Sequence, residues 1–145
     1  MQQLLEYITR HPLLVGVTAA VALASLAYEV SRARSGGQSV GPAEAVRLLN
    51  QGAVMLDVRS RDQFDAGHVI DARNVPAGEL DGAAESLKRL RDKVLIACCD
   101  NGLASAGVAR ALRGQGFSKV ATLRGGLQTW RGENLPLVKS DAKHR

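Results

Sequence analysis

The chain is short of aromatic residues, cysteines and histidines, and each shortage excludes a class of function. Aromatic residues make up 3% of the 145 residues, too few for the stacking platforms that bind single-stranded nucleic acid. The net charge is +5, but Lys and Arg are scattered, so we expect a generally basic surface and no nucleic-acid partner. His11, His68 and His144 lack the spacing of metal ligands, and we expect no metal and no other cofactor.

The only two cysteines, Cys98 and Cys99, are neighbours, which argues against a disulfide framework. A bond between adjacent cysteines needs strained geometry, and no third cysteine can pair with either of them. This usage fits a reducing compartment. It leaves one thiol that can serve as a reactive group.

An apolar run near the N-terminus, Pro12 to Tyr28, contains no charged residue and lies at the short end of what spans a bilayer. A buried core helix is disfavoured because the run is apolar on all sides and a polar segment follows it. A cleaved signal peptide is a second interpretation, because Ala22 and Ala24 form a small-x-small pattern. A retained transmembrane anchor is favoured, because the apolar run continues past that pattern.

The charges that flank the apolar run predict its orientation. Arg32 and Arg34 outweigh Arg10, and an excess of basic residues marks the cytoplasmic side of a membrane helix. We therefore expect the C-terminal part of the chain to face the cytoplasm.

A length of 145 residues suits one domain with an appendage. The polar, Gly/Ser-rich stretch SRARSGGQS indicates a flexible linker between the two. The predicted organisation is an N-terminal segment at 1–30 with a transmembrane helix at about 12–28, a linker at 31–39, a globular domain at 40–138 and a polar tail at 139–145.

The globular part alternates between strand-like and helix-like patterns. Short apolar runs predict strands at 53–58, 72–76, 93–99 and 119–126. Amphipathic spacing with Pro and Gly signals predicts helices at 42–52, 61–67, 82–92, 103–117 and 127–136. Strands that alternate with helices form a parallel sheet covered on both faces, so the predicted fold class is α/β.

The strand predicted at 93–99 ends in the two cysteines, and a helix is predicted to follow directly. A cysteine there lies at the carboxyl end of a parallel strand, where open α/β sheets place their ligands. The unpaired amides of the loop and the helix dipole favour negative charge, so they lower the pKa of a thiol. Gly102 allows the backbone to curl around the sulfur.

Alternation along this strand separates the two cysteines. Successive side chains point to opposite faces, and only Cys99 leads into the loop. Cys98 is therefore predicted to be a small core residue. For Cys99 two interpretations stay open at this point, a reactive thiol and a buried residue at the end of the strand.

Three ordered motifs between about Val40 and Val138 resemble the rhodanese-homology family of single-domain sulfurtransferases. LDVRSRDQFDAGHVIDARNVP is similar to the family's L-D-V-R strand followed by E-F-x-x-G-H-I-x-G-A-x-N-I-P. CDNGLAS stands in the place of the loop C-R-x-G-x-R-S, and GFSKVATLRGGLQTW resembles G-F-x-x-V-x-x-L-x-G-G-x-x-x-W. The apolar segment ahead of the domain resembles a membrane-anchored, YibN-like subgroup from Gram-negative bacteria.

The resemblance implies a five-stranded rhodanese sheet and a sulfurtransferase in which Cys99 carries sulfane sulfur as a persulfide and passes it to a thiophilic acceptor. Asp57 and Arg59 are expected to support the loops of the site, with an approach of Arg59 to the substrate as the alternative. His68 is expected to be a hydrogen-bonded structural residue. The anion-binding loop is expected to consist of Asp100, Asn101, Gly102, Leu103, Ala104 and Ser105.

The expected partners follow from the same resemblance. They are a small sulfur donor or a protein persulfide, a thiol acceptor and the inner membrane, with a membrane protein as a further candidate.

Two loop positions depart from the family pattern. Asp100 and Ala104 replace frequent arginines that help to hold an anionic donor such as thiosulfate. We therefore expect a thiol-bound or protein persulfide to be a better donor than thiosulfate, or little turnover at all. The same departures support a second hypothesis, a catalytically weak or inactive rhodanese-fold adaptor at the membrane.

The related phosphatase and arsenate-reductase chemistry needs a C-x5-R loop, whose arginine grips the oxyanion. The sixth residue after Cys99 is Ser105, and the sixth after Cys98 is Ala104. The sequence therefore argues against that chemistry.

Overall fold

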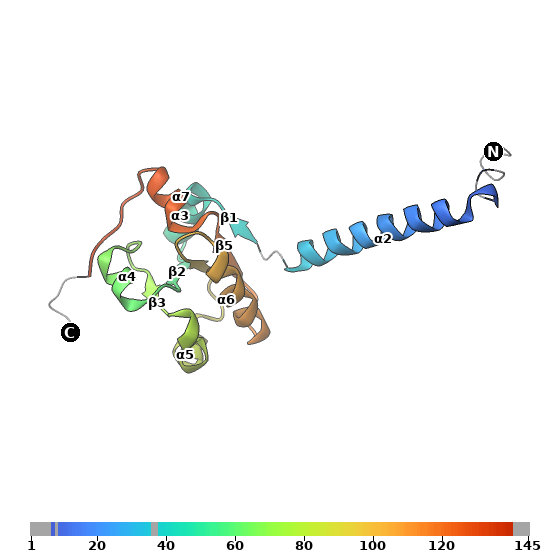
Figure 1. Ribbon diagram of the computed structural model, residues 1–145. Coiled ribbons are helices and arrows are strands. Elements are labelled where there is room, and N and C mark those ends of the chain that lie inside the picture. The colour runs from blue at the N-terminus through green and yellow to red at the C-terminus, as the bar shows by residue number, and fades with distance from the viewer. Residues whose placement is uncertain (1–6, 8, 36–37, 141–145) are drawn as a thin grey trace. The chain divides into compact units, whose positions relative to one another are not determined.

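The computed structural model describes Tyr7, residues 9–35 and residues 38–140 (Figure 1). The chain divides into two units, with the boundary between Ser35 and Gly36. Most of the polar tail predicted at 139–145 lies outside the described residues, since the description ends at residue 140.

The first unit contains helix α2, Pro12–Ser35. Its stretch Pro12–Glu29 has a mean hydropathy of 1.6, and none of that stretch is buried. Pro12 suits the first turn of the helix, where a backbone N–H has no partner within the helix. The helix is long enough and apolar enough to cross a membrane.

Helix α2 is longer than the span predicted at 12–28, and it takes up the first five residues of the linker predicted at 31–39. Ala and Arg are good helix formers, and each residue added to an existing helix gains one backbone hydrogen bond. The helix therefore continues through the polar residues up to Ser35. The last residue of the predicted linker, Ser39, lies in a strand.

The second unit is built on a five-stranded sheet in which all neighbouring strands are parallel. The order across the sheet is β1-β5-β4-β2-β3. The strands are β1 Ser39–Val40, β2 Val54–Asp57, β3 Arg73–Asn74, β4 Leu95–Cys98 and β5 Val120–Leu123. The α/β class and the five-stranded parallel sheet are confirmed. Strand β1 was not among the strands predicted from local patterns, because two residues are too few to show a period.

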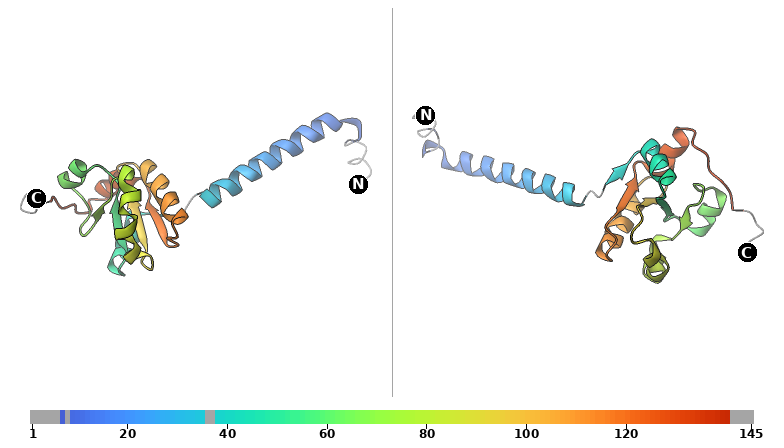
Figure 2. Two further views of the ribbon diagram at one scale, coloured as in Figure 1. Left: turned by 90° about the horizontal axis from the view of Figure 1, so that it is seen from below. Right: turned by 180° about the vertical axis from the view of Figure 1, so that it is seen from behind.

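Helices cover both faces of the sheet (Figure 2). Residues of α3, Pro42–Asn50, and α7, Gly126–Gly132, pack on one face. Residues of α5, Leu80–Leu87, and α6, Leu103–Gly114, pack on the other. The remaining elements are helix α4, Arg61–Ala66, and two short 3-10 turns at Ala77–Glu79 and Lys88–Leu90.

Strand β4 divides its side chains between two hydrophobic clusters. Ala97 and Cys99 belong to the cluster under α5 and α6, whereas Ile96 and Cys98 belong to the cluster under α3 and α7. Cys98 is fully buried, so its prediction as a core residue is confirmed. Trp130 is 3% exposed and packs in the second cluster.

Both clusters consist of residues from position 40 onward. The domain therefore builds its core without any contribution from helix α2.

The carboxyl ends of β2 and β4 lie side by side, because Asp57 pairs with Cys98 in the sheet register. The Val58 N–H donates to the carbonyl of Cys98 at 2.9 Å and continues this pairing by one residue. The loops that follow the two strands therefore begin next to each other at one edge of the sheet.

Candidate active site

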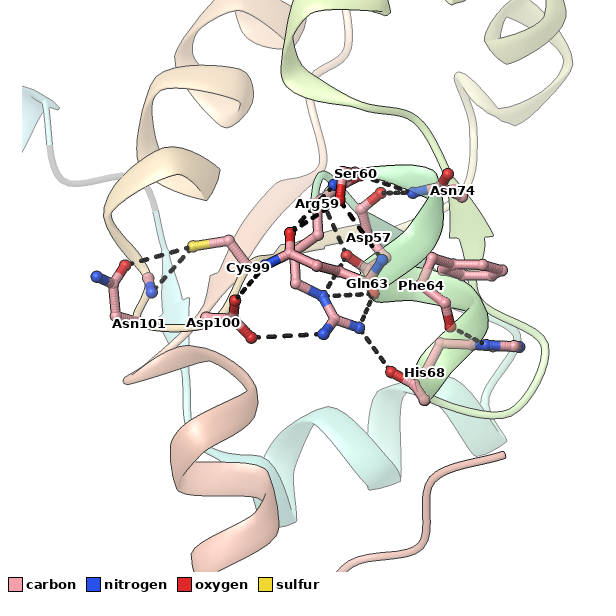
Figure 3. Close-up of polar contacts among 12 residues, drawn as sticks. Asp57, Arg59, Ser60, Gln63, Phe64, His68, Asn74, Cys99, Asp100 and Asn101 are labelled. Atoms are coloured by element: carbon pink, nitrogen blue, oxygen red, sulfur yellow. Dashed lines mark hydrogen bonds and ion pairs between the residues drawn. The ribbon is translucent and has the colours of Figure 1, made fainter. Parts of the chain in front are cut away.

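The loop between β4 and α6 curls around the sulfur of Cys99. Gly102, at the N-cap of α6, has φ 90°, a left-handed conformation that suits glycine. Its N–H donates to the Cys99 Sγ at 3.0 Å. The thiol lies 3.8 Å from the Asn101 Oδ1 (Figure 3). It also lies 3.7 Å from the Ser105 Oγ. Of the six residues expected in this loop, Asn101, Gly102 and Ser105 contact the sulfur.

The two cysteines differ in their acidity. Burial alone would raise the pKa of the Cys99 thiol, but hydrogen bonds from the backbone and hydroxyl of Ser105 and from the backbones of Asn101 and Gly102 outweigh burial and lower it. For Cys98, burial first and the nearby Asp57 second raise the pKa well above the ordinary value. Of the two thiols, Cys99 is therefore the one that loses its proton more readily.

The other loop residues divide into supporting and exposed ones. The Asn101 Oδ1 accepts the N–H of Leu103 at 3.1 Å and closes a local turn. Ser105 is fully buried, and its Oγ lies within reach of both the Gly102 carbonyl, at 3.0 Å, and the Cys99 Sγ, at 3.7 Å. The side chain of Leu103 is 78% exposed, and Ala104 is exposed as well. The surface beside the sulfur at these two positions is therefore apolar.

The carboxylate of Asp100 is held by two side chains from the neighbouring loop and helix. Its Oδ1 lies 3.4 Å from the Nη1 of Arg59, and its Oδ2 accepts from the Nε2 of Gln63 at 3.3 Å. The Asp100 side chain remains 39% exposed. Its negative charge thus stays at the rim of the loop, one residue from the thiol (Figure 3).

Arg59 forms a buried ion pair that fixes the end of β2. Its Nη2 lies 2.6 Å from the Oδ2 of Asp57 and donates to the carbonyl of Gly67 at 2.7 Å, and its Nε donates to the Asp57 Oδ1 at 3.0 Å. Burial alone would lower the pKa of Arg59, but the bond to Asp57 and the charges of Asp57 and Asp100 outweigh burial and raise it. Arg59 therefore joins three loops at this edge of the sheet.

The sequence did not single out Gln63 and Asn74 as part of the site. Gln63 reaches Asp100 from a capping box, in which the Ser60 Oγ accepts the Gln63 N–H and the Gln63 Oε1 accepts the Ser60 N–H. The Asn74 Nδ2 donates to the carbonyls of Asp57 and Arg59 at 3.1 and 2.9 Å. The S-x-x-Q spacing indicates the capping box, but no local pattern predicts the contact between Gln63 and Asp100.

The first turn of α7 forms hydrogen bonds with the backbone of the cysteine loop. The N–H groups of Leu127 and Gln128 donate to the carbonyls of Cys99 and Asp100 at 2.8 and 3.0 Å. Gly126 has φ 63°, and a Cβ atom there would overlap both carbonyl groups. The glycine at position 126, in the motif GFSKVATLRGGLQTW, therefore allows the start of α7 to pack closely against the backbone of the cysteine loop.

His68 lies away from the sulfur. Its Nδ1 is 2.8 Å from the carbonyl of Phe64, its ring stacks on the Phe64 ring, and its backbone pairs with Val138. These contacts connect α4 to the segment that follows α7, which is a structural role.

The site as a whole presents one acidic thiol, ringed by hydrogen-bond donors, at the carboxyl edge of a parallel sheet. Such a group can attack an electrophilic sulfur and hold the resulting sulfur anion.

Comparison with known proteins agrees with this architecture. The rhodanese-like domain family matches residues 41–133, more than half of the chain, and the chain therefore belongs to the rhodanese-like family. The chain is 33% identical over 141 residues to the uncharacterized protein YibN of Escherichia coli K12, covering 96% of this chain and 99% of that protein.

Two further comparisons concern the globular domain. The chain is 36% identical over 92 residues to the thiosulfate sulfurtransferase GlpE of Pseudomonas savastanoi pv. phaseolicola, covering 63% of this chain and 85% of that protein. A rhodanese-related protein from Thermoplasma volcanium has a similar structure, with a TM-score of 0.66 and 27% identity over 72% of this chain and all of that chain. The family to which the chain belongs thus includes sulfurtransferases.

Proposed function

We propose that the chain is a membrane-anchored sulfurtransferase that carries sulfane sulfur on Cys99 and passes it to a thiophilic acceptor. The observation that carries the proposal is the loop that curls around one thiol, with the Gly102 N–H at 3.0 Å from the sulfur. The similarity to sulfurtransferases of the rhodanese-like family supports the same reaction.

In the first step the Cys99 thiolate attacks the outer sulfur of a persulfide donor. A new bond forms between the Sγ and that sulfur, the sulfur–sulfur bond of the donor breaks, and the donor leaves as a thiolate. The product is a persulfide on Cys99. Its terminal sulfur carries negative charge, which the backbone N–H groups of Asn101, Gly102 and Ser105 stabilise in place of water.

In the second step an acceptor thiolate or cyanide attacks the terminal sulfur of the Cys99 persulfide. The bond between the two sulfurs breaks, and its electron pair returns to the Sγ as the thiolate. The donors that lower the pKa of Cys99 also make this thiolate a good leaving group. The same hydrogen bonds to Cys99 therefore assist both the transfer of sulfur to this residue and the transfer of sulfur from it.

The donor that suits this loop is a persulfide without a second anionic group. The Asp100 carboxylate repels thiosulfate, and Ala104 offers no positive charge in compensation. A low-molecular-weight thiol persulfide or a protein persulfide is less strongly repelled by Asp100 and does not need a positive charge at position 104.

We further propose that α2 anchors the domain in the bacterial inner membrane with the domain in the cytoplasm. The length and apolar composition of α2 support the anchor, and the excess of Arg32 and Arg34 over Arg10 supports the orientation. Protease added to the periplasmic side of spheroplasts should leave the domain intact, and its digestion there would contradict this orientation.

Sulfur transfer can be measured as the formation of thiocyanate from cyanide, with a thiol persulfide as donor. Wild-type protein and Cys98→Ser should turn over, while Cys99→Ser should not. Absence of turnover in all three proteins with every persulfide donor would contradict the proposal.

A second candidate function, an adaptor that docks proteins through the rhodanese fold, is favoured by Asp100 and Ala104, which remove the loop's anion-binding arginines. Complementation of a deletion strain separates the two. Full rescue by Cys99→Ser favours the adaptor, and no rescue favours the enzyme.

A further inference from the structure

The domain contains a cavity that the sulfur chemistry does not use. It has a volume of about 560 Å³ and lies between α3, the segment after α7, and strands β2 and β3. Residues 52–53 and Lys93, which border it, precede β2 and β4, so the cavity opens toward the amino ends of these strands. Cys99 lies at their carboxyl ends.

The walls of this cavity are apolar. Val46 and Leu49 from α3, Met55 from β2, Trp130 from α7 and Leu135 from the following segment line it. Ile70, at the mouth, is 50% exposed. A concave, mostly apolar space of this size is typical of a site for a small ligand.

The rim of the cavity carries charge of mixed sign with a positive excess. Arg73 and Lys93 are cationic and Asp71 is anionic. Within the part of the chain that the structure describes, neither cation forms an ion pair or a side-chain hydrogen bond. Both positive charges are therefore available to a ligand that enters between the apolar walls.

We propose that this cavity binds an anionic amphiphile, a molecule with an unbranched apolar chain and a carboxylate head. The apolar chain lies against Trp130 and the α3 side chains, where its burial from water stabilises the complex. The carboxylate lies at the rim, next to Arg73 and Lys93. The charge balance favours an anion over a cation or a neutral head group.

The site is independent of the proposed sulfur transfer. It uses none of the residues around Cys99 and lies toward the other edge of the sheet. A failure of this proposal therefore leaves the sulfurtransferase proposal intact, and the reverse also holds.

Trp130 is the only tryptophan of the chain and lines this cavity, so tryptophan fluorescence can follow binding there. The domain from Gly36 to Arg145 is suitable for the measurement, since its core needs no residue of α2. Titration with dodecanoate below its micelle concentration should change the Trp130 emission saturably. Dodecanol and dodecyltrimethylammonium, which have the same chain length, should bind more weakly.

Three variants test the assignment. Val46→Phe fills the cavity and should abolish the fluorescence change. Arg73→Gln and Lys93→Gln are exposed substitutions that preserve the fold, and each should weaken dodecanoate binding about two- to fivefold, as expected for a partly exposed charge pair, without changing dodecanol binding. Arg89→Gln, an exposed cation outside the cavity, is the matched control and should bind as wild type.

The absence of any saturable change with dodecanoate overturns the proposal. So does dodecanol or dodecyltrimethylammonium binding as tightly as dodecanoate, or unchanged dodecanoate binding in both Arg73→Gln and Lys93→Gln. Cys99→Ser should bind dodecanoate as the wild-type domain does.

Discussion

Gly126 lies against the backbone of Cys99, so closely that a Cβ atom at position 126 would overlap the Cys99 carbonyl oxygen. The contact allows the Leu127 N–H to donate to that oxygen at 2.8 Å. A helix that begins 27 residues after the thiol thus fixes the first residue of the cysteine loop.

Gly126→Ala should slow persulfide formation on Cys99 by about ten- to hundredfold, because displacement of a reactive group by as little as about 1 Å has effects of this size. The left-handed backbone at Gly126 adds a cost of about 1–2 kcal/mol in stability. Stopped-flow loading with a thiol persulfide measures the rate. Gly132→Ala in the same helix, where a Cβ meets no atom within 4 Å, is the control. Equal loading rates in the two variants would show that the contact with Cys99 is unimportant.

Ser105→Ala should raise the pKa of Cys99, because it removes the hydroxyl that stabilises the thiolate. Cys99 has a lowered pKa, so its reactivity with iodoacetamide should persist below the pH at which ordinary cysteines lose theirs and decline as the pH falls further. In Ser105→Ala this decline should move to higher pH, and the rate at pH 7 should fall about tenfold, since a hydrogen bond to a charged group contributes about 1.5 kcal/mol or more.

The control for this profile is Ser86→Ala, whose hydroxyl bonds only within α5. An identical pH profile for wild type and Ser105→Ala would exclude a part for the hydroxyl in acidifying Cys99.

Asp100→Asn should change the choice of donor. It removes a negative charge next to the sulfur while an amide oxygen can still accept from Gln63. Loading from thiosulfate should increase about three- to tenfold relative to loading from a persulfide without a second anionic group, because the Asp100 charge no longer opposes the doubly charged donor. The double variant Asp100→Arg with Ala104→Arg should increase it further. Asp62→Asn, an exposed carboxylate on α4, is the control, and a donor ratio that stays constant in all three variants contradicts the proposed selectivity.

Arg59→Ala should destabilise the domain by about 3–5 kcal/mol, since it leaves the fully buried Asp57 carboxylate without its partner. Urea unfolding measures the loss. Lys88→Ala removes one partner of the exposed pair with Glu85 and should cost less than about 1 kcal/mol. A small effect of both substitutions would mean that the Asp57–Arg59 pair does not fix the end of β2.

Local sequence patterns predicted the parts of the fold that depend on residues close together in the chain. The run 93–99 alternates between two cores, and this alternation alone separates Cys98 from Cys99. The resemblance to the rhodanese loop implied that Gly102 and Ser105 belong to the site, and both residues contact the sulfur.

The contacts that sequence patterns did not predict join residues far apart in the chain. Asp100 meets Arg59 across 41 positions and Gln63 across 37, and only the sheet register, which pairs Asp57 with Cys98, brings their loops together. The extension of α2 to Ser35 was missed for another reason. A Gly/Ser-rich composition indicated a linker, although its first five residues are compatible with a helix that has already formed.

The most direct test of persulfide chemistry on Cys99 is mass spectrometry of the protein after incubation with a sulfane-sulfur donor. Peptide mapping should find one added sulfur on Cys99 in the wild type and in Cys98→Ser, and none in Cys99→Ser. Added sulfur on Cys98 alone, or none on either cysteine with any donor, would contradict the assignment of Cys99 as the sulfur carrier.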